Sequence, residues 1–218
     1  AGNDTISSTD GNDRIEGNEG NDVITVWSGL NLIWGGPGDD IITGGTDADR
    51  IEGNEGDDEI NAGADADQVW GNAGNDIILG GLGDDRLFAG AGVDRIEGED
   101  GDDYIEAGLG IGNVLYGGTG NDTIHGSDEG SDINPTFPEL LYGDLIYGGL
   151  GDDRIFGLGG ADQIEGNEGY DYIDGGAHSD TISGGTGNDE IWAGVGGLAD
   201  YIQGDEGNDL IYGSHVGD

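Results

Sequence analysis

The chain has 218 residues, of which 51 are glycine, 48 are Asp or Glu and 5 are basic, and its formal net charge is −43. This balance argues against nucleic acid and anionic membranes as partners, because contacts with phosphate groups require cationic side chains. Cysteine is absent, which excludes a disulfide framework and a thiolate metal site, and no stretch resembles a signal peptide or a membrane-spanning segment.

Only 33% of the residues are hydrophobic, and low hydrophobicity with a high net charge is typical of chains that cannot fold unaided. The aliphatic residues are nevertheless strictly periodic, which a disordered segment does not require. Both observations are satisfied if a bound cation supplies the missing positive charge.

A nine-residue unit accounts for the periodicity, and the stretch 35–43, GGPGDDIIT, is a complete copy. Its first six residues, Gly-Gly-x-Gly-Asp-Asp, suit a tight turn, since glycine adopts positive φ and the carbonyl and carboxylate groups can face inward. Its last three residues, Ile41 to Thr43, suit a short strand with the central Ile on one face. Further copies begin at Gly17, Gly80, Gly117, Gly148 and Gly184.

The unit keeps its phase along the chain. Asp occupies position 6 every nine residues from Asp4 to Asp103, with Asn31 as the one replacement in that stretch, and an aliphatic residue occupies position 8 without interruption from Ile6 to Ile105. A signal held over a dozen units predicts that position 8 forms a continuous core.

The phase slips in three places and recovers after each. One residue is added before Tyr116, where Asn113 stands in the place of Asp, and two are added before Gln203. The longest slip, at about 126–143, contains Pro135 and Pro138, which cannot donate to a strand ladder, and it predicts a protruding loop. Because the pattern is the same on both sides, residues 1–218 are expected to form a single repeat array.

The pattern Gly-Gly-x-Gly-x-Asp-x-aliphatic-x resembles the calcium-binding nonapeptide of RTX (repeats-in-toxin) proteins. The resemblance implies an all-β fold, a parallel β-roll solenoid with two nonapeptides (about 18 residues) per turn, two facing parallel sheets and calcium-binding loop columns on both edges. The spacing agrees with this fold: each short strand reverses the chain once, the position-8 side chains fill the gap between the sheets, and successive strands stack ~4.8 Å apart.

Stacking the turns brings the position-6 carboxylates into two columns. Two unit charges ~5 Å apart repel by roughly 0.8 kcal/mol in water and by ~3 kcal/mol at an effective dielectric constant of 20, and the sum rivals the ~5–15 kcal/mol stability of an ordinary domain. A hard divalent cation between the loops would turn this net repulsion into a net attraction. The donors are all oxygen, which favours calcium over magnesium and over zinc or copper, which prefer His or Cys.

In RTX rolls the ion lies between neighbouring loops of one edge, and the resemblance implies on the order of 15–20 calcium ions here. Sites at Asn31 and Asn113 are expected to be weaker, and the loop geometry is in doubt where position 4 is Asp47, Asp65 or His178. The ligands implied by the resemblance are Asp4, Asp13, Asp22, Asp40, Asp49, Asp58, Asp67, Asp76, Asp85, Asp94, Asp103, Asp122, Asp144, Asp153, Asp162, Asp171, Asp180, Asp189, Asp200 and Asp209.

Other polar and aromatic residues have simpler interpretations. Asp or Asn at position 5 is expected to shape the turn, and His125, His178 and His215 are expected to be surface residues. The outward Trp34 and Trp70 indicate either cross-strand packing or lateral docking of another chain. No Ser/His/Asp or Cys/His set can be assembled, and calcium explains the paired carboxylates better than a glycosidase site does, so the chain is not expected to be an enzyme.

Two functions remain open. The first is a calcium-folded structural module of a secreted or cell-surface protein: a rod, an adhesin or S-layer-like component, or a fibre-forming segment that associates end to end, laterally or with neighbouring repeats. The alternative is a C-terminal export and folding module of an RTX toxin, protease or lipase whose catalytic part lies elsewhere. The resemblance implies type I secretion for both. Ice binding is disfavoured, because position 3 carries no regular rank of Thr.

Overall fold

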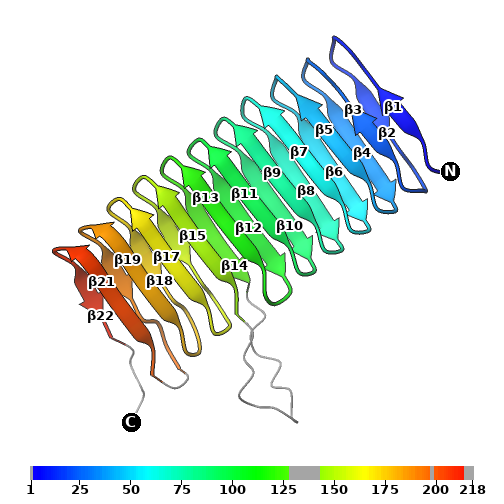
Figure 1. Ribbon diagram of the computed structural model, residues 1–218. Helices are drawn as coiled ribbons and strands as arrows, with labels where there is room; N and C mark the ends of the chain where they lie inside the picture. Colours follow the sequence, from blue (N-terminus) through cyan, green and yellow to red (C-terminus); the bar gives the residue numbers. More distant parts are fainter. Residues whose placement is uncertain (1, 128–142, 197–198, 214–218) are drawn as a thin grey trace, which may run out of the picture.

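The computed structural model describes residues 2–127, 143–196 and 199–213, and all the regular structure in these ranges is β-strand. The chain alternates between two parallel sheets of 11 strands each, so that every turn of the solenoid contributes one strand to each sheet (Figure 1). The expected all-β parallel β-roll is therefore confirmed.

The odd-numbered strands form one sheet, called here the odd sheet, and the even-numbered strands form the even sheet. The odd sheet contains β1 (Thr5–Ser7), β3 (Val23–Thr25), β5 (Ile41–Gly45), β7 (Glu59–Ala64), β9 (Ile77–Leu82), β11 (Arg95–Asp100), β13 (Val114–Thr119), β15 (Leu145–Leu150), β17 (Gln163–Glu168), β19 (Thr181–Gly187) and β21 (Tyr201–Gly207). The even sheet contains β2 (Arg14–Glu16), β4 (Leu32–Pro37), β6 (Arg50–Glu55), β8 (Gln68–Ala73), β10 (Arg86–Ala91), β12 (Tyr104–Leu109), β14 (Thr123–Ser127), β16 (Arg154–Phe156), β18 (Tyr172–Asp174), β20 (Glu190–Trp192) and β22 (Leu210–Tyr212).

The register pairs each position of a unit with the same position one turn later. Ile60 lies opposite Ile78 in the odd sheet, 18 residues on. The slips do not disturb this alignment, because Ile96 pairs with Leu115 and Leu115 pairs with Ile146 across the insertions. A one-residue shift would turn the core side chains to the outer face, so the added residues are accommodated in the loops.

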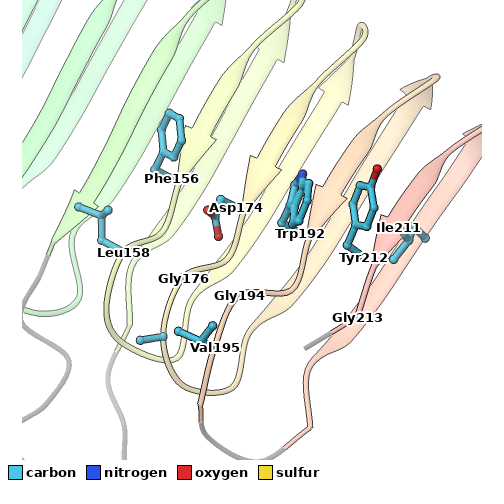
Figure 2. Close-up of a pocket in the computed structure, with 11 residues that line it drawn as sticks. Phe156, Leu158, Asp174, Gly176, Trp192, Gly194, Val195, Ile211, Tyr212 and Gly213 are labelled. Carbon is cyan, nitrogen blue, oxygen red and sulfur yellow. The ribbon is translucent and has the colours of Figure 1, made fainter. Parts of the chain in front are cut away.

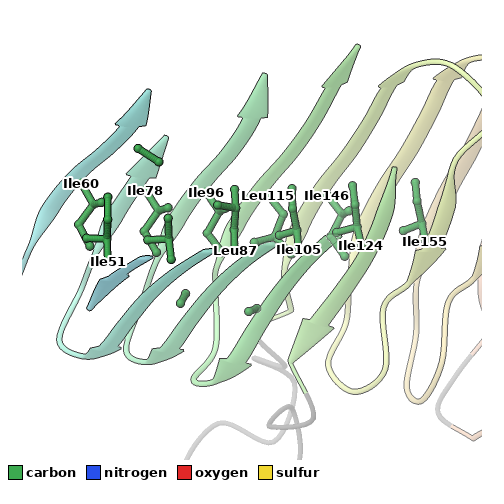
Figure 3. Close-up of a cluster of buried hydrophobic side chains, with 14 of the residues drawn as sticks. Ile51, Ile60, Ile78, Leu87, Ile96, Ile105, Leu115, Ile124, Ile146 and Ile155 are labelled. Carbon is green, nitrogen blue, oxygen red and sulfur yellow. The ribbon is translucent and has the colours of Figure 1, made fainter. Parts of the chain in front are cut away.

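The core is mainly a double row of position-8 side chains between the two sheets, joined by position-1 residues such as Val26 and Ala62 (Figure 3). Ile51, Ile60, Ile78 and Leu87 are each 0% exposed. The row is only one side chain deep on each sheet, and it is continuous from Ile15 to Ile191. This arrangement confirms that position 8 forms the core.

Most strands are longer than the three residues that the sequence predicts. Strands such as β6 and β8 have six residues and continue through positions 1 to 3 of the next unit. The prediction was wrong because positions 2 and 3 also pair from turn to turn, as Asn54 does with Asn72 and Glu55 with Ala73. A residue with positive φ at position 2, such as Asn54 at 89°, bends the strand without ending its ladder.

The loop expected around Pro135 and Pro138 falls on residues 128–142 and lies outside the described residues, so it stays a prediction. Its flanking strands, β14 and β15, continue the even and odd sheets. Among the described residues, no helix is long and apolar enough to cross a membrane.

Candidate metal centre

The position-6 residues form one column along each edge of the roll. The loops that lead into odd strands form the odd edge, and those that lead into even strands form the even edge. Every position-6 Asp from Asp22 to Asp189 is buried. In the end turns, Asp4 is exposed and Asp13, Asp200 and Asp209 are partly exposed. The odd edge contains Asp4, Asp22, Asp40, Asp58, Asp76, Asp94, Asn113, Asp144, Asp162, Asp180 and Asp200, and the even edge contains Asp13, Asn31, Asp49, Asp67, Asp85, Asp103, Asp122, Asp153, Asp171, Asp189 and Asp209.

From Asp22 onward, one oxygen of each position-6 carboxylate ties its loop to the preceding turn. The backbone N–H of Asp40 donates to Asp58 Oδ1 at 2.8 Å, and that of Asp58 donates to Asp76 Oδ1 at 2.9 Å. The same hydrogen bond recurs along the even edge, as from Asp67 N–H to Asp85 Oδ1 at 2.7 Å. Position 6 therefore holds successive loops in register through Oδ1.

The second oxygen, Oδ2, is buried and has no hydrogen-bond partner among the described residues at most of these positions. Leaving a buried carboxylate oxygen unpaired is costly, and more so for a charged group. The orphaned atoms are Oδ2 of Asp22, Asp40, Asp49, Asp58, Asp67, Asp76, Asp85, Asp94, Asp103, Asp122, Asp153, Asp162, Asp171, Asp180, Asp189 and Asp200.

Where position 1 is glycine, the orphaned oxygen converges there with a backbone carbonyl of the next turn. A Cβ added to Gly53 would collide with Asp58 Oδ2 and would lie 3.1 Å from the carbonyl oxygen of Gly71. On the even edge, a Cβ at Gly80 would lie 2.5 Å from Asp85 Oδ2 and 2.8 Å from the carbonyl oxygen of Gly98. Glycine at position 1 thus leaves room beside two oxygens from successive turns.

The loop backbone requires glycine for a second reason. Gly56, at position 4, has a φ of 129°, and a Cβ there would overlap the carbonyl oxygen of Gly38. Asp65 and His178 replace glycine at this position and keep a positive φ of 74° and 88°, so these two loops retain the left-handed conformation. Asp47 does not have positive φ among the described residues, and its Oδ2 accepts the N–H of Gly29 at 2.8 Å instead.

Burial disfavours the ionised form of these carboxyl groups in the absence of a counter-ion. The pKa of Asp67, Asp153 and Asp162 is raised to about 8, chiefly by desolvation and also by repulsion from neighbouring carboxylates, although the backbone N–H of the preceding turn acts to lower it. The same causes raise the pKa of Asp58 and Asp103 to about 7. A cation beside Oδ2 would stabilise the ionised form and so offset both of the effects that raise the pKa.

The residues present fit a calcium ion better than another metal. The described residues contain no cluster of three or more His, Cys, Asp or Glu side chains, so an ion held at these loops would need carbonyl oxygens as well as carboxylates. Calcium accepts six to eight oxygens, including carbonyls, in flexible geometry. The orphaned Oδ2 atoms and the adjacent carbonyls supply this type of donor.

Two positions depart from the pattern in a way that the sequence indicated only in part. Asn31 and Asn113 occupy position 6, and each donates its amide Nδ2 to the next Asp of its column, at 2.9 Å to Asp49 Oδ1 and 3.1 Å to Asp144 Oδ1. Sequence analysis missed Ser127, whose N–H and Oγ donate to Asp144 Oδ2 at 2.7 and 3.0 Å.

Ser8 makes the corresponding hydrogen bond to Asp13 Oδ2. Sequence analysis missed this residue also. A serine in place of the position-1 glycine was the only available signal for Ser8.

The outer face of the even sheet carries an aromatic ladder rather than a metal site. Trp70 stacks on Phe88 with ring centroids 5.5 Å apart and an interplanar angle of 8°, and the guanidinium of Arg50 lies 4.4 Å from the Trp70 ring centroid. His125 lies between Tyr104 and Phe156, at 5.5 and 4.8 Å. These contacts are cross-strand packing, and the ring faces are covered by one another.

An apolar groove of 780 Å³ lies at the C-terminal end of the even sheet (Figure 2). It opens where β16, β18 and β20 end after three residues, and its walls include Phe156, Leu158, Trp192 and Val195. Asp174 is the one carboxylate among its described lining residues. The described lining residues include no nucleophile–base pair and no donor set for a metal.

Comparison with known proteins agrees with the geometry of the loops. No curated protein matches the chain. The family model for the RTX calcium-binding nonapeptide repeat matches residues 1–129 and 141–215 in overlapping stretches. Repeats of this family bind Ca²⁺ at multiple sites and are typically associated with secreted proteins, and an array made of repeats alone suggests a non-catalytic module. The chain belongs to the RTX calcium-binding nonapeptide repeat family, and calcium is its cofactor.

Proposed function

We propose that this chain is a calcium-folded structural rod of a secreted or cell-surface protein. The observation that carries the proposal is the double column of orphaned Oδ2 atoms, most of them beside a carbonyl oxygen of the next turn. These columns run the length of a roll whose core is one side chain deep on each sheet, so the ions would be structural parts of most turns.

The ligands in this proposal are the position-6 Asp residues together with loop carbonyls. An ion between two turns of the odd edge would be held by Asp58 Oδ2, the carbonyl of Gly71 and the carboxylate of Asp76. It would neutralise charges that burial penalises at both Asp58 and Asp76, whose pKa values are raised to about 7. The chain carries a net charge of −43, and on the order of 15–20 divalent ions would cancel most of it.

Folding would then be a calcium switch. Without metal, the carboxylates of each column repel one another along both edges of the roll. Only a thin hydrophobic core opposes this repulsion and the loss of chain entropy on folding. The chain would stay unfolded where calcium is scarce, and it would fold in the millimolar calcium of extracellular fluids, in the range where extracellular calcium modules bind.

The test is far-UV circular dichroism of the purified chain in calcium and in EDTA, followed by light scattering of the calcium form. We expect a coil spectrum in EDTA and a reversible change to a β spectrum on addition of calcium, with no comparable change on addition of magnesium. A β spectrum that persists after exhaustive removal of calcium would contradict the proposal. In the scattering measurement, a monomeric rod indicates a spacer, and growth with concentration indicates a fibre-forming segment.

The second candidate is an export and folding module attached to a toxin, protease or lipase. It rests on the same calcium switch, with the array serving a catalytic part elsewhere in a longer chain. The two functions differ in what the array does for its neighbours. We expect an export module, fused to a reporter domain, to make secretion of that reporter dependent on the calcium concentration outside the cell, whereas a rod would leave the yield unchanged.

A further inference from the structure

Asn31 and Asn113 replace Asp at position 6, once in each column. Their side chains carry an amide nitrogen where an Asp would have the oxygen Oδ2. Each keeps the ladder hydrogen bond of its neighbours, because Asn31 Oδ1 accepts the N–H of Asp13 at 3.0 Å and Asn113 Oδ1 accepts the N–H of Asp94 at 2.8 Å. The other terminal atom is therefore an amide nitrogen, which donates hydrogen bonds and cannot ligate a cation.

The amide nitrogen occupies the gap between turns in which an ion would lie. Asn31 Nδ2 donates to the carbonyl of Gly29 at 2.6 Å and to Asp49 Oδ1 at 2.9 Å. Asn113 Nδ2 donates to Asp144 Oδ1 at 3.1 Å and is 3.5 Å from the carbonyl of Gly110. In each case one amide joins a loop carbonyl of its own turn to the carboxylate of the next turn, which are the two kinds of group that a calcium ion would join.

The residues around these two amides also differ from those of the other loops, and the differences favour closure without an ion. Position 1 of the Asn31 unit is Val26, a buried side chain, where most units have glycine. Beyond Asn113, the Oδ2 atom of Asp144 is not orphaned, because Ser127 donates to it through both N–H and Oγ. Asp13, which precedes Asn31 in its column, has its Oδ2 bound by Ser8.

We propose that the gaps between Asn31 and Asp49 and between Asn113 and Asp144 hold no calcium and are closed by the side-chain amides. These two contacts, the Asn31 bridge and the Asn113 bridge, replace a divalent ion by a hydrogen-bond donor that belongs to the chain. The proposal rests on the proposed calcium sites elsewhere in the columns. Because the bridges lie in different columns, each edge of the roll has one turn whose closure is independent of the calcium concentration.

The test compares the calcium stoichiometry of folded variants by equilibrium dialysis at saturating calcium. Asn31→Asp and Asn113→Asp each restore a carboxylate, and we expect each to bind one ion more than the parent chain. Asn113→Ala removes the amide, and we expect it to bind the same number of ions as the parent. Asp76→Ala calibrates the measurement, because it removes a proposed ligand and should bind at least one ion fewer.

Asn121→Asp is the matched control for charge. Asn121 is an exposed position-5 residue of a neighbouring loop, so the added carboxylate should leave the ion count unchanged. An Asn→Asp variant that loses its β spectrum in saturating calcium, while Asn121→Asp keeps it, also supports the bridges, because a carboxylate buried without an ion is strongly destabilising.

Three results distinguish the possible failures. Loss of an ion from Asn113→Ala, or an unchanged ion count in both folded Asn→Asp variants, would overturn the bridges while leaving the calcium rod intact. A parent chain that binds no calcium would overturn the proposed function itself.

Discussion

At the scale of the residue, the two oxygens of each position-6 carboxylate have different environments. Oδ1 accepts a backbone N–H from the preceding turn, as at Asp58 with 2.8 Å, whereas Oδ2 is buried with no described partner. The first contact positions the side chain without a metal. The second contact is missing, and in the proposed function a cation beside Oδ2 would offset the cost of burying this oxygen.

We expect Asp58→Ala to lower the calcium stoichiometry by at least one ion and to destabilise the calcium form by on the order of 3–5 kcal/mol, the range for breaking a buried charge pair. The destabilisation follows because Asp40 N–H loses its acceptor and Asp76 loses the ion that it shares. Calcium dialysis and a urea denaturation curve in calcium measure both effects. Asp57→Ala is the control, because Asp57 is the exposed position-5 neighbour. Equal ion counts for the two variants would count against the assignment of Asp58 as a ligand.

At the scale of the element, each strand places one residue type in the core and another at the surface. In β12, Ile105 is 0% exposed between the sheets, whereas Leu109 at the end of the same strand is 54% exposed. The alternation explains how a chain with 33% hydrophobic residues forms a core, since nearly all the position-8 side chains are committed to it. The outward ladder from Trp70 to Tyr172 adds cross-strand packing on the even sheet.

We expect Ile105→Ala to lower the free energy of unfolding in calcium by about 2–5 kcal/mol, because it leaves a cavity in a core with no second layer to relax into it. Leu109→Ala, in the same strand, should change it by about 0.5 kcal/mol or less, as for most surface substitutions. Chemical denaturation at fixed calcium measures the two values. Similar losses for both variants would mean that strand β12 is not held mainly by its inward side chain.

At the scale of the whole molecule, burial and repulsion act together on two columns of carboxylates. The pKa of Asp67, Asp153 and Asp162 is raised to about 8 and that of Asp49 and Asp85 to about 6 by desolvation first and neighbouring carboxylates second. Because the folded values lie above the ordinary value of 3.8, the unfolded chain loses its protons at lower pH than the folded chain does. The metal-free fold is therefore least stable above the folded pKa values.

We expect the β content in EDTA to be highest below about pH 4, to fall as the pH rises from about 4 through the folded pKa values of about 6 to 8, and to be lowest above about pH 8. Calcium should reverse this dependence, because binding displaces the protons and is strengthened by their loss. Far-UV circular dichroism across this pH range, with EDTA and with calcium, measures both curves. Metal-free β content that increases with pH would show that carboxylate ionisation does not oppose folding.

The nine-residue phase of Asp and Ile was enough to predict the parallel β-roll, its 18-residue turn, the core positions and the two Asp columns, because in a repeat protein each turn contacts only its neighbours and a local period sets the global register. The same local information predicted three-residue strands, which is too short, because the pairing of Asn54 with Asn72 and of Glu55 with Ala73 depends on stacked turns.

Tertiary structure alone decided how each polar atom is partnered. The sequence shows that Asn31 and Asn113 lack a carboxylate, but only the three-dimensional structure shows that their amide nitrogens reach Asp49 and Asp144 in the next turn. Ser127 likewise meets Asp144 from the far side of an insertion, 17 residues away. The physical reason is that repeat spacing determines which residues align, whereas hydrogen bonding depends on which atom of an aligned side chain faces which turn.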